Sequence, residues 1–201
     1  VPGERRRTLP FFARHPRLTA AGWLVATALP TLLGAYRPDG PLPPQLLMLI
    51  VLGAALGLGL STVGGEIAAR VPIHALVAFQ GFRFPLELVL HHWVELGVAP
   101  PQMTWTGANV DIVAGVLALA AAPIVWKWPR AGWLPTGLGI VLLANVVLVV
   151  ARSLPGPLQA YPDAITLPHM FPHVWIATVC VTGAAAAHVV AVRALLGHKP
   201  H

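Results

Sequence analysis

Three polar residues share one face of an otherwise apolar stretch of this sequence. Gln80, Arg83 and Glu87 are spaced at i, i+3 and i+7, so a helix would place them on one side. We expect Arg83 and Glu87, four residues apart, to form an ion pair, and Pro85 to kink the helix between them. Inside a membrane such a group indicates a ligand site or a proton site, and the alternative is a clamp that fixes helix packing.

A second polar group follows in the segment 100–111. Gly107 suits a tight turn there, and Asn109 or Asp111 can cap a helix that starts at Ile112. Asp111 is also placed to join Arg83 in a charge network. In the last apolar stretch, His188 is predicted at about the depth of Gln80, and we expect a hydrogen bond between the two.

Residues of metal-binding type form another set near the ends of the apolar stretches. The candidates are His91, His92, Glu95, His169 and His173. Imidazoles on facing helices can hold a metal ion or the axial positions of haem. The chain has no HExxH and no CxxCH motif, and its one cysteine, Cys180, excludes an internal redox disulfide. A haem or metal cofactor is therefore one interpretation of these histidines, and unligated interface residues are the other.

The composition indicates that these residues lie in a membrane. The chain is 56% hydrophobic with a mean hydropathy of +0.72. Only 10% of its 201 residues are charged, against about 25% in soluble domains. So few charges cannot cover a soluble surface, which excludes a typical soluble enzyme, a disordered chain and a nucleic-acid-binding module. The net charge of +6 comes mostly from basic residues that flank apolar stretches, as in the cytoplasmic loops of membrane proteins.

Six apolar stretches predict the elements that position the polar residues. They are 18–36, 45–64, 73–96, 112–128, 134–152 and 174–195, each long enough to cross about 30 Å of hydrocarbon. With the N-terminus inside, ten of the 13 basic residues fall on the inner side, two on the outer side, and Arg83 within a span. The ten are Arg5, Arg6, Arg7, Arg14, Arg17, Arg70, Lys127, Arg130, Arg193 and Lys199, and the two are Arg37 and Arg152.

The sequence therefore predicts an all-α, polytopic bundle of six transmembrane helices with cytoplasmic N- and C-termini. We expect a basic interfacial segment at 1–17, the transmembrane domain at 18–195 and a short tail at 196–201. The basic start before an apolar run also fits a secretory signal, but the run is long for one, so a retained span is expected. Gly53 and Gly57, in the second stretch, are expected to pack inside the bundle rather than form a dimer seam.

Two motifs carry a resemblance to a known family. They are Gln80-Gly-Phe-Arg83-Phe-Pro-Leu-Glu87 and the segment from Pro101 to Ile112. Together they resemble the QxFRxxxE and PxxMTxxGxNxDI patterns of an uncharacterised family of small bacterial multi-pass membrane proteins, over roughly residues 45–195. The resemblance implies a bacterial inner-membrane protein and no particular activity. It also implies that eight residues form one cluster, namely Gln80, Arg83, Glu87, Met103, Gly107, Asn109, Asp111 and His188.

Three functions fit these observations. The first is an integral membrane binding or accessory protein, which includes a subunit of a larger membrane complex, with lipid and other membrane subunits as partners. The second is a small proton-coupled transporter that uses Glu87, Asp111 and Arg83. The third is a haem- or metal-binding protein or an intramembrane enzyme. The short loops favour the first, and the absence of the rhomboid GxSG and CaaX-protease EExxxR motifs disfavours an enzyme.

Overall fold

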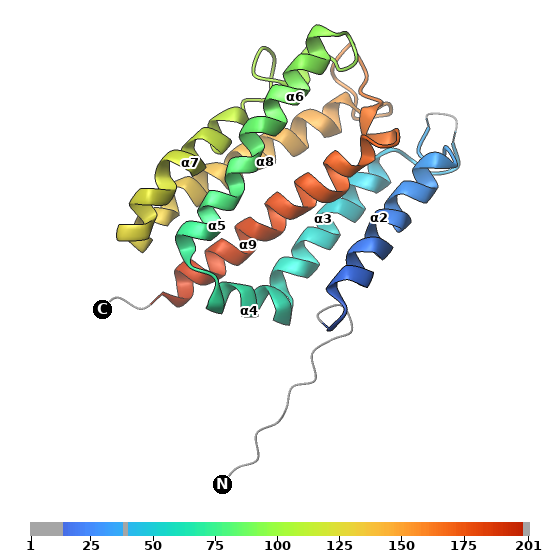
Figure 1. The fold of residues 1–201 in the computed structure, drawn as a ribbon. Helices are drawn as coiled ribbons and strands as arrows, with labels where there is room; N and C mark the ends of the chain where they lie inside the picture. The colour runs from blue at the N-terminus through green and yellow to red at the C-terminus, as the bar shows by residue number, and fades with distance from the viewer. Residues whose placement is uncertain (1–13, 38–39, 199–201) are drawn as a thin grey trace.

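The computed structural model describes residues 14–37 and 40–198, and these ranges contain helices and their connections but no strand. The long helices run side by side, and α4 lies across one end of them (Figure 1). The helices are α2 (Pro16–Leu32), α3 (Gln45–Leu60), α4 (Thr62–Arg70), α5 (Ile73–Phe79), α6 (Arg83–Glu95), α7 (Ile112–Lys127), α8 (Trp133–Ser153) and α9 (Thr182–Gly197). Residues 1–13 and 199–201, which hold most of the predicted basic segment and part of the predicted tail, lie outside the described residues.

Two of the predicted stretches are interrupted rather than continuous. The second bends by 58° between α3 and α4, where the Ser61 side chain accepts a hydrogen bond from the Gly64 N–H at 3.1 Å and caps α4. The third changes to a 3-10 turn at Gln80–Phe82, between α5 and α6. Pro85 has no N–H to bond the carbonyl of Gly81, four residues earlier, so the ladder loosens at that turn.

Helix α9 lies at the centre of the bundle, in contact with α3, α4, α5 and α8. Small residues make this possible, because a Cβ at Gly59 of α3 would lie only 2.7 Å from the Cβ of Val189. Gly53 and Gly57 differ from Gly59. Both are exposed, with nothing within 4 Å of a built Cβ, so the expectation that they pack inside the bundle is wrong.

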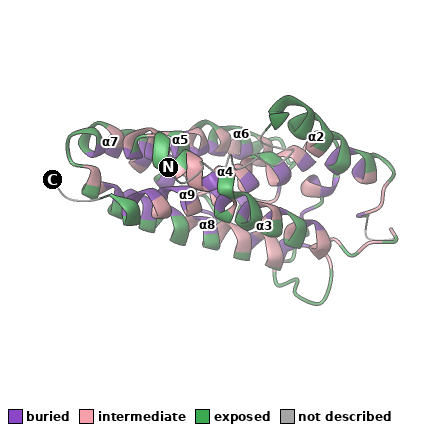
Figure 2. Ribbon diagram, turned by 90° about the horizontal axis from the view of Figure 1, so that it is seen from below, coloured by how far each residue is buried: buried purple, intermediate pink, exposed green. Residues whose placement is uncertain are grey.

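Helix α2 lies at one edge of the bundle (Figure 2). It is held mainly through the segment before α9. The indole N–H of Trp23 donates to the carbonyl of Thr178 at 2.7 Å, and that of Trp175 donates to the carbonyl of Leu24 at 3.4 Å. The helix is 17 residues long and contains Pro30.

The buried and exposed side chains are distributed as expected for a protein surrounded by lipid. Arg83 and Glu87 are only 1% and 2% exposed, whereas Leu134 and Val141 on α8 are 71% and 64% exposed. Among the described residues, three helical stretches are long and apolar enough to cross a membrane, and the bent pair α3–α4 makes a fourth if taken as one span. The three are Ile73–Glu95, Pro129–Ser153 and Ile176–Gly197.

Candidate functional site

Arg83, the first residue of α6, joins three helices through its guanidinium group. Its Nε donates to Oδ2 of Asp111 at 2.6 Å, and its Nη2 donates to Oδ1, so the ion pair is bidentate. Its Nη1 donates to the carbonyl of Gly139 on α8 at 3.2 Å. Asp111 is the N-cap residue of α7, where the helix dipole favours a negative charge. The arginine therefore connects α6, α7 and α8 deep inside the bundle.

The predicted ion pair between Arg83 and Glu87 is wrong. Both side chains face the protein interior as expected, but the carboxylate that Arg83 binds is that of Asp111. Glu87 instead accepts a hydrogen bond at Oε1 from the Nδ2 of Asn109 at 2.9 Å. The shared helix face brings the two charged residues to the same region without pairing them directly.

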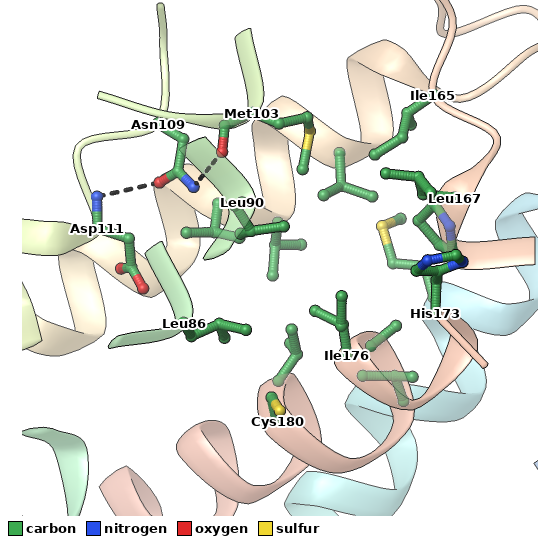
Figure 3. A pocket seen from close by; sticks show the side chains of 18 of the residues that line it. Leu86, Leu90, Met103, Asn109, Asp111, Ile165, Leu167, His173, Ile176 and Cys180 are labelled. Atoms are coloured by element: carbon green, nitrogen blue, oxygen red, sulfur yellow. Dashed lines mark hydrogen bonds between the residues drawn. The ribbon is translucent and has the colours of Figure 1, made fainter. Parts of the chain in front are cut away.

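Asn109 is the hydrogen-bonding centre of the segment 100–111. Its Nδ2 donates to Glu87 at 2.9 Å. It also donates to the carbonyl of Met103 at 2.9 Å, and its Oδ1 accepts from the N–H of Asp111 at 3.0 Å (Figure 3). Both amide hydrogens are thus used. At Gly107 a Cβ would lie 2.4 Å from the carbonyl oxygen of Pro101, so this turn accepts glycine only. The segment is folded tightly enough to fix Asp111 against Arg83.

His188 on α9 completes the cluster from the opposite side. Its Nε2 lies 3.2 Å from Nη1 of Arg83. A guanidinium group can only donate, so Nε2 accepts and the ring proton lies on Nδ1. The expected hydrogen bond between Gln80 and His188 is wrong, because Gln80 donates through Nε2 to the carbonyl of Ala184 at 3.1 Å. The His188 ring lies over Gly139, where a Cβ would be 2.5 Å from its Cε1.

The cluster is not fully satisfied. Among the described residues, three of its buried side-chain atoms have no hydrogen-bond partner: Oε1 of Gln80, Oε2 of Glu87 and Nδ1 of His188. Buried polar atoms are nearly always bonded, and each unbonded one costs about 1–3 kcal/mol. Such atoms in a native structure call for an explanation, and a bound molecule is one.

A cavity of about 100 Å³ lies beside the cluster and is lined by Glu87. Its walls come from α3, α6, α8 and the π-helical turn Ile176–Val181 that precedes α9. Turns of this type widen a helix and are frequent at functional sites. The cavity is mostly apolar, with Asn109 and Asp111 on one side and His173 on the opposite side (Figure 3). A site of this shape can hold a small organic molecule.

The candidate metal ligands do not converge. His91 and His92 each approach Glu95, at 3.7 and 3.5 Å, while His169 and His173 are held elsewhere. His169 donates through Nε2 to the carbonyl of Pro44 at 3.2 Å. Within the ranges 14–37 and 40–198, no group of three or more His, Cys, Asp or Glu side chains is placed to hold a metal ion.

Aromatic packing accounts for the positions of two of these histidines. The His91 ring stacks on Trp105 at 4.1 Å between centroids, and His173 packs edge-on against Trp93 at 4.9 Å. Burial lowers the pKa of His169 below its ordinary value, and the bond to Pro44 offsets part of that shift. These contacts favour the interpretation of interface and packing residues.

Sequence reasoning missed the contribution of α8 and of the cavity wall. Gly139 supplies a carbonyl to Arg83 and the space for His188, and the signal available was a glycine within an apolar stretch. For His173 the sequence suggests a metal ligand or an interface residue, and neither interpretation places it in the wall of the cavity. Cys180 also lines the cavity and gave no signal, because a single cysteine in an apolar helix resembles any small core residue.

The chain matches no protein family model, no curated protein and no solved structure. The resemblance carried by the two motifs therefore stays a prediction. The function has to be argued from the geometry of the cluster and the cavity.

Proposed function

We propose that this chain is a six-span protein of the bacterial inner membrane that binds a small molecule in the cavity beside the Arg83–Asp111 pair. It acts as a binding or accessory protein, alone or as a subunit of a larger membrane complex. The observation that carries the proposal is the carboxyl oxygen Oε2 of Glu87, which is buried beside the cavity without a partner. A cluster that only fixed helix packing would satisfy both oxygens of its most buried acid.

The distribution of charge supports the proposed topology. Six basic residues described by the structure lie at the end of the bundle that α4 crosses, and two lie at the opposite end (Figure 1). The six are Arg14, Arg17, Arg70, Lys127, Arg130 and Arg193, and the two are Arg37 and Arg152. Basic residues collect on the cytoplasmic side of membrane proteins. The first turn of α2 and the last turn of α9 both lie at this end, so we propose that both are on the cytoplasmic side.

Two helices need a further argument to count as spans. Helix α7 has 16 residues, or about 24 Å at about 1.5 Å per residue. Trp126, in the last turn of α7, and Trp128, its C-cap, have side chains that are 70% and 64% exposed, and such residues favour the membrane interface. A short span is accommodated by local thinning of the bilayer. Helix α2 runs alongside the others and carries exposed apolar residues such as Leu29 and Leu32.

The proposal is tested by asking whether a molecule is purified with the protein and whether it depends on Glu87. The wild type, Glu87→Gln and Glu66→Gln are purified in the same mild detergent, denatured, and the released small molecules identified by mass spectrometry. Glu66 is a half-buried acid on α4, remote from the cavity, so it is the matched control. Glutamine at position 87 keeps an oxygen for Asn109, so the fold should persist.

We expect one molecule to be released from the wild type and from Glu66→Gln, and little or none from folded Glu87→Gln. Equal amounts from all three proteins, or no molecule from any of them, would overturn the proposal.

A further inference from the structure

The cavity has an unsatisfied hydrogen-bonding atom on each of two opposite sides. On one side it is Oε2 of Glu87, and on the other it is Nδ1 of His173. The His173 ring is held by its edge-on contact with Trp93, so its nitrogen is fixed in direction. Figure 3 places His173 across the cavity from Asn109, the hydrogen-bond partner of Glu87.

The other polar groups of the cavity wall are already engaged. Both oxygens of Asp111 accept from Arg83, both amide hydrogens of Asn109 are donated, and Nε2 of His169 is bonded to Pro44. Within the part of the chain that the structure describes, the buried lining atoms without a partner are therefore those of Glu87 and His173.

The space between the two sides is apolar. Figure 3 shows the side chains of Leu86, Leu90, Met103 and Ile176 around it, together with the thiol of Cys180. A buried water needs two to four polar partners, and the middle of this cavity offers none. Water would therefore leave the middle empty, whereas a molecule with an apolar middle would fill it.

We propose that the cavity binds a small molecule with an apolar middle and a hydrogen-bonding group at each end. One group bonds Oε2 of Glu87 and the other bonds Nδ1 of His173. The volume of about 100 Å³ suits a body no larger than one six-membered ring, since an engineered protein cavity of about 150 Å³ holds a benzene molecule. The inference rests on the proposed function and specifies the chemistry of its ligand.

Cys180 gives a direct readout, because it is the one cysteine of the chain and lines the cavity. Three probes of similar size differ in the number of polar ends: trans-1,4-cyclohexanediol has two, cyclohexanol has one and cyclohexane has none. Each is added to the purified protein, and the rate of Cys180 alkylation by N-ethylmaleimide and the thermal midpoint are measured. Both readouts report occupation of the cavity, and the thermal midpoint does so even if Cys180 reacts slowly.

We expect the diol to protect Cys180 and to raise the thermal midpoint most, with binding about three- to tenfold tighter than cyclohexanol for the second hydrogen bond. Glu87→Met and His173→Phe, which each remove the bonding atom, should each weaken diol binding by a similar factor. His92→Phe is the matched control, because His92 lies at the same end of the bundle with its side chain 65% exposed, and it should change nothing. His173→Phe keeps the test open if Glu87→Met does not fold.

Equal effects of the three probes would overturn the two-ended ligand while leaving a binding cavity. The absence of any effect would also overturn it. The proposed function fails separately, if no molecule is released from the purified wild type.

Discussion

Arg83 forms its ion pair with Asp111, 28 residues along the chain, and not with Glu87, one turn away on its own helix. Asp111 offers both carboxylate oxygens from the start of α7, so the two groups meet in a bidentate pair. Glu87 accepts a hydrogen bond from Asn109 instead, and its second carboxylate oxygen has no partner. The same cluster thus connects the helices and leaves one buried carboxylate oxygen of Glu87 without a hydrogen-bond partner.

The pair between Arg83 and Asp111 should be essential for stability. Arg83→Met leaves a carboxylate buried without a cation, which lowers the free energy of unfolding by about 3–5 kcal/mol. Adding Asp111→Leu removes that charge, so the double variant should recover part of the loss. Tryptophan fluorescence during unfolding in mixed detergent micelles measures both changes.

Arg70→Met is the matched control for this experiment. Arg70 pairs with Glu66 at 3.8 Å, but its side chain is 79% exposed, and pairs of that kind contribute little. A loss at Arg70 as large as that at Arg83 would contradict the special role of the buried pair.

The membership of the cluster was predictable from the sequence, but its pairing was not. Helical spacing places Gln80, Arg83 and Glu87 on one face, and all three are buried. Spacing along one helix identifies neighbours on that helix only. The choice between Glu87 and Asp111 depends on how α6 and α7 approach each other, where a Cβ at Gly115 would lie 2.3 Å from the backbone nitrogen of Phe84.

The breaks in the helices were also not predictable from the sequence. Apolar stretches predicted the elements and most of their ends, because hydrophobic length is a local property. Hydropathy gives no signal for the π-helical turn Ile176–Val181 or the bend at Ser61, because apolar and small residues continue through both regions. The π-helical turn forms part of the cavity wall, so the position of the cavity had to come from the structure.

Two glycines should be intolerant of a methyl group. Gly115→Ala would place its Cβ 2.3 Å from the backbone of Phe84, and Gly139→Ala would place it 2.5 Å from the His188 ring. Overpacking of this kind lowers the free energy of unfolding by about 1–3 kcal/mol. Gly115→Ala should be more destabilising than Gly139→Ala, because the backbone of Phe84 cannot move aside as a side chain can. Thermal midpoints in detergent measure the effect.

Gly57→Ala is the control for these substitutions, since nothing lies within 4 Å of its Cβ. Alanine there should be neutral or stabilising by up to about 1 kcal/mol, because glycine disfavours a helix interior. A destabilisation at Gly57 equal to that at Gly139 would show that the clash is not the cause.

His169 should make the protein less stable in mild acid. Burial lowers its pKa in the folded state below the ordinary value of 6.5. Below about pH 6.5 the unfolded chain therefore takes up a proton that the folded chain does not, and stability falls as the pH falls. His169→Gln keeps a donor for Pro44 and does not titrate. The thermal midpoint should drop less for this variant than for the wild type between about pH 7.5 and about pH 5.5, and an equal drop would refute the role of His169.

The proposed topology predicts which residues are reached from each side of the membrane. In a Cys180→Ala background, single cysteines are introduced at Arg14, Gly197 and Leu158 and treated with a membrane-impermeant maleimide. Arg14 lies just before α2, Gly197 is the last residue of α9, and Leu158 is 57% exposed between α8 and α9. Since six spans return the chain to its starting side, the first two should react in inverted vesicles and Leu158 in right-side-out vesicles. If the cysteines at positions 14 and 197 react from opposite sides, the number of spans is odd, and α2 or α7 lies at the membrane surface.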